Sequence, residues 1–171
     1  HHLFFGREEQ AMELLRRLRV TRFLAISGQS GSGKSSLVRS GLVPSLQKGF
    51  VAQAGAKWRV ATFQPGNNPI LNLAQSIAQR NVLHPNTKME PNYPEHVEAT
   101  LRRSSLGIVV TYQESKIRDN LLIVVDQFEE LFKYHEKEKA SKIAQTDAIS
   151  FVNSLLVASN QRDYPIYIVI T

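Results

Sequence analysis

Cysteine is absent from this sequence of 171 residues, which excludes disulfide bonds and metal sites built on thiolates. This absence is compatible with a reducing compartment, and we expect a cytoplasmic protein. Long apolar runs are absent too. The clearest run, residues 121–125, is far shorter than the roughly 20 residues that span a bilayer, so we expect no membrane contact.

Acidic residues are fewer than basic ones, with 15 Asp and Glu against 21 Lys and Arg and a formal net charge of +6. Such an excess is compatible with nucleic acid or with nucleotide phosphates as partners. The basic residues are scattered, however, and their two clusters, residues 16–19 and residues 102–103, fall in helix-like stretches. The charge pattern therefore does not favour dedicated nucleic-acid binding.

Helix-like and strand-like patterns alternate along the chain. We expect helices over residues 7–19, 33–47, 69–80, 95–105, 128–133 and 145–158, and strands over residues 22–27, 58–64, 120–126 and 164–171. Residues 106–118 are compatible with either a strand or a buried helix, and Pro44 is expected to end or kink its helix. The alternation predicts an α/β fold in which helices cover both faces of a parallel sheet.

The most specific feature is a glycine-rich turn between an expected strand and an expected helix. Residues 28–35, GQSGSGKS, fit the phosphate-loop pattern G-x-x-x-x-G-K-[ST]. The backbone N–H groups of such a loop surround a β-phosphate, and the positive end of the helix dipole adds to the attraction. Lys34 is expected to reach the β- and γ-phosphates, and the Ser35 hydroxyl is expected to bind Mg²⁺. The expected nucleotide-binding residues of this loop are Gly28, Gln29, Ser30, Gly31, Ser32, Gly33, Lys34, Ser35 and Ser36.

A second motif follows the most apolar expected strand. Asp126 comes directly after that strand, where a phosphate-loop protein needs a carboxylate on the magnesium side. We favour this role over that of a simple helix N-cap. The residue that positions the attacking water is left open among Gln127, Glu129 and Glu130. Both glutamates are also compatible with a merely favourable interaction with the helix dipole, and without a well-placed group hydrolysis would be slow.

These motifs resemble those of the novel STAND NTPases, bacterial signalling proteins often fused to WD-repeat or protease-like domains. LFFGREEQ at residues 3–10 precedes the phosphate loop, and FQPG at residues 63–66 follows an expected strand. VDQFEELF at residues 125–132 looks very like the acidic motif of that class. The resemblance covers nearly the whole chain. It implies a three-layer P-loop NTPase sandwich of strand order 5-1-4-3-2, with this sequence truncated after the fourth core strand.

The resemblance also implies a function. The chain would be the switch domain of a signal-transduction protein that binds and hydrolyses ATP, or less favourably GTP, with Mg²⁺. Nucleotide binding would be coupled to homo-oligomer formation and to activation of an effector. Phe5, Gly6 and Arg7 would lie near the base or ribose, and Thr171, at the end of the fourth strand, would sense the γ-phosphate.

The same resemblance places the fifth strand, the lid, the winged-helix region and any WD-repeat or effector domain outside this sequence. Residues 1–2, two histidines, are interpreted as a possible tag remnant. Without a fifth strand, the strand at residues 22–27 would be an open sheet edge that invites pairing between copies of the chain.

Two other functions remain compatible with the sequence. One is a nucleotide-binding scaffold with negligible hydrolysis, because many ATPases have glutamate where this chain has Gln127. The other is a P-loop kinase of a small molecule, which would need an acceptor site and a basic lid. An ABC transporter subunit is not favoured because the stretch Leu-Ser-Gly-Gly-Gln is absent, and a DNA-dependent ATPase is supported only by the net charge.

Overall fold

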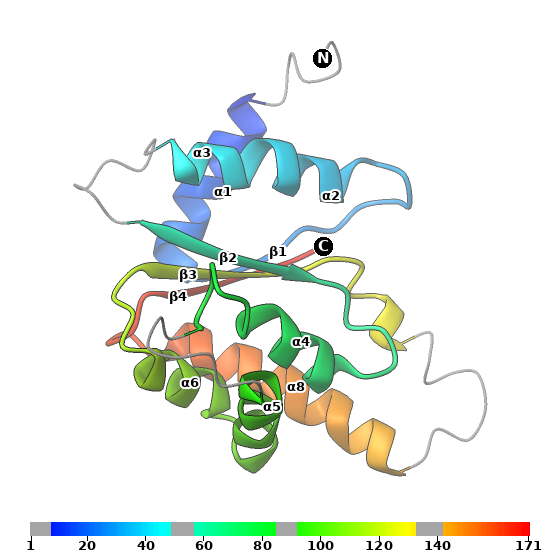
Figure 1. Ribbon diagram of the computed structural model, residues 1–171. Coiled ribbons are helices and arrows are strands. Elements are labelled where there is room, and N and C mark those ends of the chain that lie inside the picture. The colour runs from blue at the N-terminus through cyan, green and yellow to red at the C-terminus, as the bar shows by residue number, and fades with distance from the viewer. Residues whose placement is uncertain (1–7, 49–56, 85–91, 133–141) are drawn as a thin grey trace.

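The computed structural model describes residues 8–48, 57–84, 92–132 and 142–171. A parallel sheet of four strands lies between two layers of helices (Figure 1). The strands, in spatial order β1-β4-β3-β2, are β1 (Phe23–Ala25), β4 (Ile166–Ile170), β3 (Asn120–Val125) and β2 (Trp58–Phe63). This arrangement confirms the predicted three-layer α/β fold, and the strand order agrees with the one that the resemblance implies.

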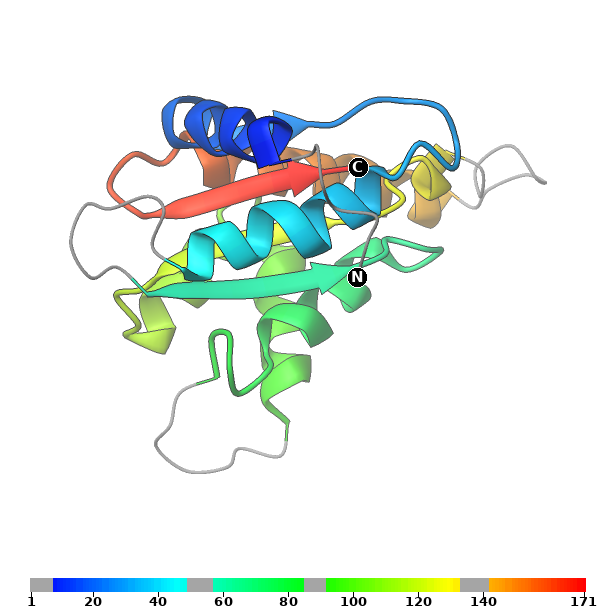
Figure 2. The same cartoon turned by 90° about the horizontal axis from the view of Figure 1, so that it is seen from above.

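Helices cover both faces of the sheet. One face carries α1 (Glu8–Thr21) and a continuous helical segment made of α2 (Lys34–Ser36), η1 (Leu37–Leu42) and α3 (Val43–Gln47). The other face carries α4 (Pro69–Ile77), α5 (Tyr93–Arg103), α6 (Gly107–Ser115) and α8 (Lys142–Asn160). Seen from above, the strands point the same way, so their carboxyl ends meet at one edge of the sheet (Figure 2).

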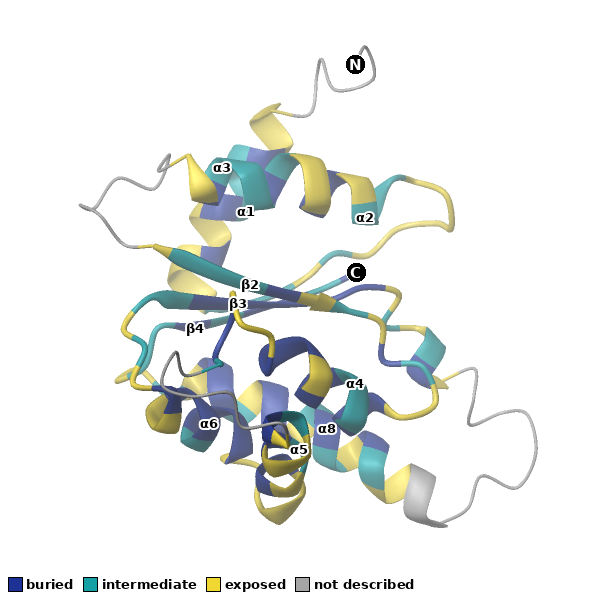
Figure 3. Ribbon diagram, viewed as in Figure 1, coloured by how far each residue is buried: buried dark blue, intermediate teal, exposed yellow. Residues whose placement is uncertain are grey.

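The side chains of β3 explain why two separate cores form. Leu122 and Val124 pack with α1, η1 and α3, whereas Leu121, Ile123 and Val125 pack with the helices of the opposite face. Successive side chains of a strand point to opposite faces, so a strand covered on both sides must be apolar throughout. Burial is accordingly concentrated along the central strands and on the helix faces that meet them (Figure 3).

The ambiguous stretch at residues 106–118 contains a helix, α6, and no strand. Ile108, Val109 and Tyr112 are buried there against the core beneath the sheet. Their spacing of one and four residues brings them onto one helix face. The periodicity of a short apolar run does not distinguish a buried helix from a strand. In this protein the segment is helical and packs against α5.

The first strand is shorter and more exposed than residues 22–27 were expected to be. Arg22 has a left-handed backbone (φ 59°), and its N–H donates to the Leu18 carbonyl at 2.9 Å, so it ends α1. The Arg22 guanidinium then donates to the carbonyls of Gln161 and Tyr164 at 3.2 and 2.7 Å. Because β1 lies at one edge of the described sheet, its residues are half-buried or exposed.

Pro44 does not end its helix, which continues to Gln47. The N–H of Val43 donates to the carbonyl of Val38, five residues earlier, so the preceding turn η1 is a π-helix. A proline ring clashes with the carbonyl four residues before it, and the wider turn relieves this clash. The expected break is therefore replaced by a change of helical pitch.

The helix expected from residue 128 begins later. Residues 126–129 form turns, and helical structure starts only at Glu130. The N–H groups of Glu130 and Leu131 donate to carbonyls three residues earlier, those of Gln127 and Phe128. The chain therefore leaves β3 through a tight turn, which keeps this segment close to the end of the sheet.

Replacing Ile123 by alanine should lower the free energy of unfolding by about 2–5 kcal/mol, because its side chain is fully buried between β3 and the helices below it. Ile149 on α8 is 64% exposed and provides the matched control. Ile149→Ala should change the free energy by less than about 0.5 kcal/mol. Urea denaturation followed by circular dichroism measures both, and equal effects would contradict the packing described.

Candidate functional site

The glycine-rich turn joins β1 to α2 and is mostly exposed. Gly33 forms the N-cap of α2 with φ 83° and ψ 24°, a left-handed conformation that glycine adopts without steric cost. A Cβ atom on Gly28 would lie 2.9 Å from the Ser32 hydroxyl oxygen, so the Ser32 side chain would have to shift to make room for it. The loop therefore favours glycine at Gly33 by its backbone conformation and at Gly28 by this close approach.

The lysine of the motif folds back over the loop. The Lys34 ammonium donates to the Gly28 carbonyl at 2.9 Å and to the Gln29 carbonyl at 3.3 Å. The Gln29 carbonyl also accepts the N–H of Ser32 at 3.1 Å, which closes the turn. Ser36 is exposed on α2, one residue beyond the Ser35 hydroxyl. These contacts hold the positive charge of Lys34 against two carbonyls of the loop.

An open cavity of about 470 Å³ lies beside this loop. Gly28, Ser30 and Lys34 line it from the loop side, and Glu129 and Thr171 line it from the ends of β3 and β4. The cavity therefore lies at the carboxyl edge of the sheet, where ligands of open α/β sheets bind.

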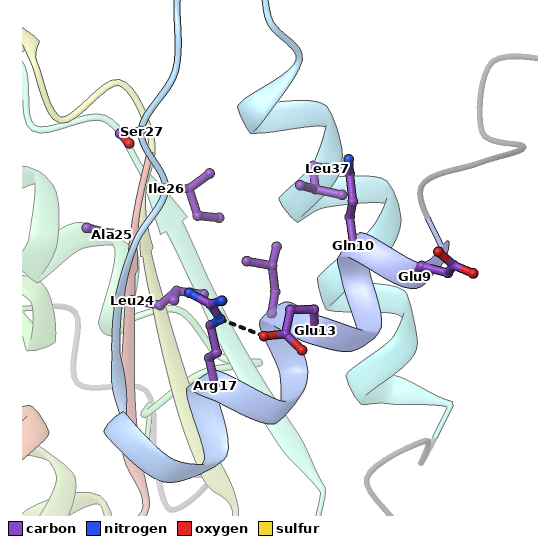
Figure 4. Close-up of a pocket in the computed structure, with 10 residues that line it drawn as sticks. Glu9, Gln10, Glu13, Arg17, Leu24, Ala25, Ile26, Ser27 and Leu37 are labelled. Carbon is purple, nitrogen blue, oxygen red and sulfur yellow. Dashed lines mark hydrogen bonds and ion pairs between the residues drawn. The ribbon is translucent and has the colours of Figure 1, made fainter.

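A second groove adjoins the first cavity. It runs between α1 and the outer edge of β1, where Arg17 donates to Glu13 at 2.7 Å (Figure 4). Ala25, Ile26 and Ser27 border both spaces. The groove thus leads from the phosphate loop toward the first helix.

Asp126 stands at the centre of the site. Its side chain is only 3% exposed, and one carboxylate oxygen, Oδ1, accepts hydrogen bonds from the hydroxyls of Ser35 at 2.5 Å and Thr171 at 2.7 Å. The other oxygen, Oδ2, accepts the guanidinium of Arg39 at 2.5 Å. One carboxylate therefore ties the helix after the loop to the ends of β3 and β4.

The same contacts keep this carboxylate ionised. Burial alone raises the pKa of Asp126, because it disfavours the charged form. Hydrogen bonds from Ser35 and Thr171, the charge of Arg39 and the N–H of Gln127 outweigh burial and lower the pKa below its ordinary value of 3.8. At neutral pH, Asp126 thus presents only acceptors.

The turn after Asp126 is strained. Gln127 has a left-handed backbone (φ 56°), a conformation that costs about 1–2 kcal/mol for a residue with a Cβ atom. In return, the N–H of Gln127 reaches the Thr171 hydroxyl at 3.3 Å, and the N–H of Phe128 reaches the Thr171 carbonyl at 2.8 Å. The strained turn therefore joins the ends of β3 and β4.

The structure distinguishes the three candidates for positioning water. Glu129 borders the cavity, whereas Gln127 and Glu130, both within the described residues, do not. The Gln127 side chain is exposed, and that of Glu130 is half-buried. Glu129 is thus the best placed of the three.

Most predicted site residues meet at this edge of the sheet, but not all can be placed. Lys34, Ser35, Asp126, Glu129 and Thr171 surround the cavity or the buried carboxylate. Gly31 lies at the exposed tip of the loop. The residues expected near the base or ribose, numbers 5–7, lie outside the described residues.

Sequence reasoning missed Arg39. It follows Ser35 by four residues, a spacing that brings two side chains onto one helix face. The spacing could have predicted that Arg39 lies beside Ser35. It could not have shown that both side chains contact Asp126, because that contact depends on the packing of the helix against β3.

The donor set of the site suits a hard divalent cation. The Ser35 hydroxyl, which donates to the Asp126 carboxylate at 2.5 Å, and the carboxylate itself both offer oxygen atoms, the ligand type that Mg²⁺ prefers. Over residues 8–48, 57–84, 92–132 and 142–171, no group of three His, Cys, Asp or Glu side chains is placed to hold a metal. A cation between these two residues would thus take further ligands from phosphate and water.

A parallel sheet, a glycine-rich loop before a helix and an acidic strand end together define the P-loop NTPase class. The family model described as Novel STAND NTPase 1 matches residues 1–171, and the chain belongs to this family. Membership supports a nucleotide-binding switch domain with a general dependence on nucleotide and metal. Neither a curated protein nor a solved structure matches the chain. None of the described helices is both long and apolar enough to cross a bilayer.

The depressed pKa of Asp126 predicts a pH dependence of stability. A carboxylate with a lowered pKa in the folded state stabilises the fold above its unfolded pKa, and this stabilisation is lost as pH falls through the folded pKa. The free energy of unfolding of the wild-type protein should thus approach that of Asp126→Asn as pH falls from about 5 through the folded pKa, which lies below 3.8.

Urea denaturation across that pH range measures this convergence. Asp163→Asn, a change at an exposed position, is the control and should follow the wild-type protein throughout. A constant difference between Asp126→Asn and wild type would show that ionisation of this carboxyl does not stabilise the fold.

Proposed function

We propose that this domain binds ATP in preference to GTP, together with Mg²⁺, and acts as the nucleotide switch of a signalling protein. One observation carries the proposal: the loop with Lys34 and the hydroxyl of Ser35 meets the buried carboxylate of Asp126 beside an open cavity. Each of these groups has a matching part in a nucleoside triphosphate with its cation.

The phosphates would occupy the concave side of the loop. Lys34 now donates to two loop carbonyls, and its ammonium can exchange these for the β- and γ-phosphate oxygens without moving far. Ser35 would bind Mg²⁺ directly and Asp126 through water. The bound cation would supply neutralisation of the phosphate charge.

The remaining roles follow from position. Glu129 would orient the attacking water, since it borders the cavity. Thr171 would sense the γ-phosphate, because it borders the same cavity and donates to Asp126. Phe5, Gly6 and Arg7 would hold the base or ribose. The groove beside α1 supports this last role, because it adjoins the loop and α1 follows these residues in sequence.

The preference for ATP, homo-oligomer formation and the coupling to an effector or WD-repeat domain rest on the resemblance. The cytoplasmic location rests on the absence of cysteine. A second function, a nucleotide-binding scaffold with negligible hydrolysis, is favoured by one observation. Gln127 takes the position of the glutamate of many ATPases, and it does not border the cavity.

Titration with fluorescent ATP and GTP in the presence of Mg²⁺ tests nucleotide binding. The wild-type protein should bind ATP more tightly than GTP, and Lys34→Ala should weaken ATP binding by about 10–100-fold, because an ammonium–phosphate contact is lost. Lys48→Ala, an exposed lysine just after the same helical segment, should bind as wild type does. Equal affinity in all three proteins would contradict a phosphate-binding loop.

Phosphate release from ATP at saturating concentration distinguishes the switch that hydrolyses ATP from the scaffold. Glu129→Gln should reduce the rate by about 100-fold, whereas Glu130→Gln should leave it within a few-fold of wild type. Both variants should still bind ATP. No release above background by a wild-type protein that binds ATP would favour the scaffold.

A further inference from the structure

Arg39 belongs to the site by contact, although no role in the expected phosphate chemistry requires it. Its guanidinium lies 2.5 Å from Oδ2 of Asp126. The two partners differ in exposure, with 58% of the Arg39 side chain accessible against 3% for Asp126. The carboxylate is therefore fixed in the core, and the arginine reaches it from the solvent side.

The local structure sets up this contact. Arg39 lies in the π-helical turn η1, four residues after Ser35, so both side chains face the end of β3. The two side chains contact different oxygens of the carboxylate. Ser35 and Thr171 donate to Oδ1, and Arg39 donates to Oδ2. Each oxygen of Asp126 thus has a donor.

This division has an electrostatic consequence. A cation that approaches Asp126 meets a carboxylate already paired with one positive charge and hydrogen-bonded at both oxygens. Lys34 adds a second positive charge on the loop side. The guanidinium must leave Oδ2, or share the carboxylate, before a divalent cation gains its full attraction. Because the Arg39 side chain is more than half exposed, moving it into solvent breaks its contact with Asp126 but leaves the apolar cores intact.

We propose that Arg39 is a positioning residue that acts as the internal counter-ion of Asp126 and competes with Mg²⁺ for this carboxylate. The inference rests on the proposed function, which it deepens by naming a regulator of the cation site. Arg39 keeps the buried charge paired while no divalent cation is bound, and it raises the cation concentration that the site requires. The arginine is then released from Asp126 when the cation binds, so the position of its side chain depends on whether the cation site is occupied.

Mn²⁺ is a suitable probe, because its binding is measured directly by electron paramagnetic resonance. Titrations with and without ATP should show that Arg39→Gln binds Mn²⁺ about three- to tenfold more tightly than wild type, the effect of removing one partly screened charge. Arg16→Gln, at an exposed arginine that also pairs with a carboxylate, is the matched control and should not change the affinity.

A second variant covers the case in which Arg39→Gln leaves the buried carboxylate unpaired and does not fold. Arg39→Lys keeps a positive charge on a shorter side chain and should show a smaller shift in the same direction. In either variant, Mn²⁺ affinity equal to or weaker than that of wild type would overturn the proposal.

ATP binding in the presence of EDTA separates this inference from its alternatives. Arg39→Gln should bind ATP as wild type does under these conditions, because no divalent cation competes. Weaker binding in EDTA would instead make Arg39 a phosphate ligand and overturn the proposal. A wild-type protein that binds no ATP under any condition contradicts the proposed function, and the Mn²⁺ titration without ATP then decides the role of Arg39 alone.

Discussion

The buried carboxylate of Asp126 is the interaction on which the candidate site depends. A charged group removed from water is tolerated only when its hydrogen bonds are made, and here Ser35, Thr171 and Arg39 make them. These partners come from the helix after the loop and from the end of β4. Satisfying one charge therefore fixes three chain segments that are far apart in sequence.

The sheet makes this convergence possible. In a parallel sheet all carboxyl ends lie at one edge, so the loop after β1 and the ends of β3 and β4 meet there. Left-handed positions at this edge include Gly33 in the loop and Gln127 after β3. Of these two, only Gln127 is strained, and its contact with Thr171 joins the ends of β3 and β4, two strands that are anchored in the apolar cores.

Such a linkage suits a switch domain of the STAND family, to which the chain belongs. The contacts of Asp126 lead to two elements, through Arg39 to η1 and through Thr171 to the end of β4. Under the role proposed for Arg39, a cation at this carboxylate would displace a surface side chain and leave the apolar cores unchanged.

By itself, the sequence determined the architecture and the chemical type of the site. Short apolar runs predicted the four strands of the described sheet, because a strand covered on both faces, such as residues 120–125, must be apolar throughout. The phosphate-loop pattern was equally decisive, because Gly33 has a left-handed backbone and Gly28 lies close to the Ser32 side chain, two conditions that favour glycine. Element ends were less predictable, as the late start of β1 after Arg22 shows.

Only the tertiary structure decided the choices that depend on contacts between distant residues. The stretch at residues 106–118 contains the helix α6 because its apolar side chains pack into the core beneath the sheet. Arg39 joined the site because the helix after the loop packs over the end of β3, and Glu129 was separated from Glu130 by which side chain reaches the cavity. The pattern of apolar residues reflects only how each residue is buried within its own helix or strand. The partners of the buried Asp126 carboxylate depend instead on where three separate segments meet in the folded chain.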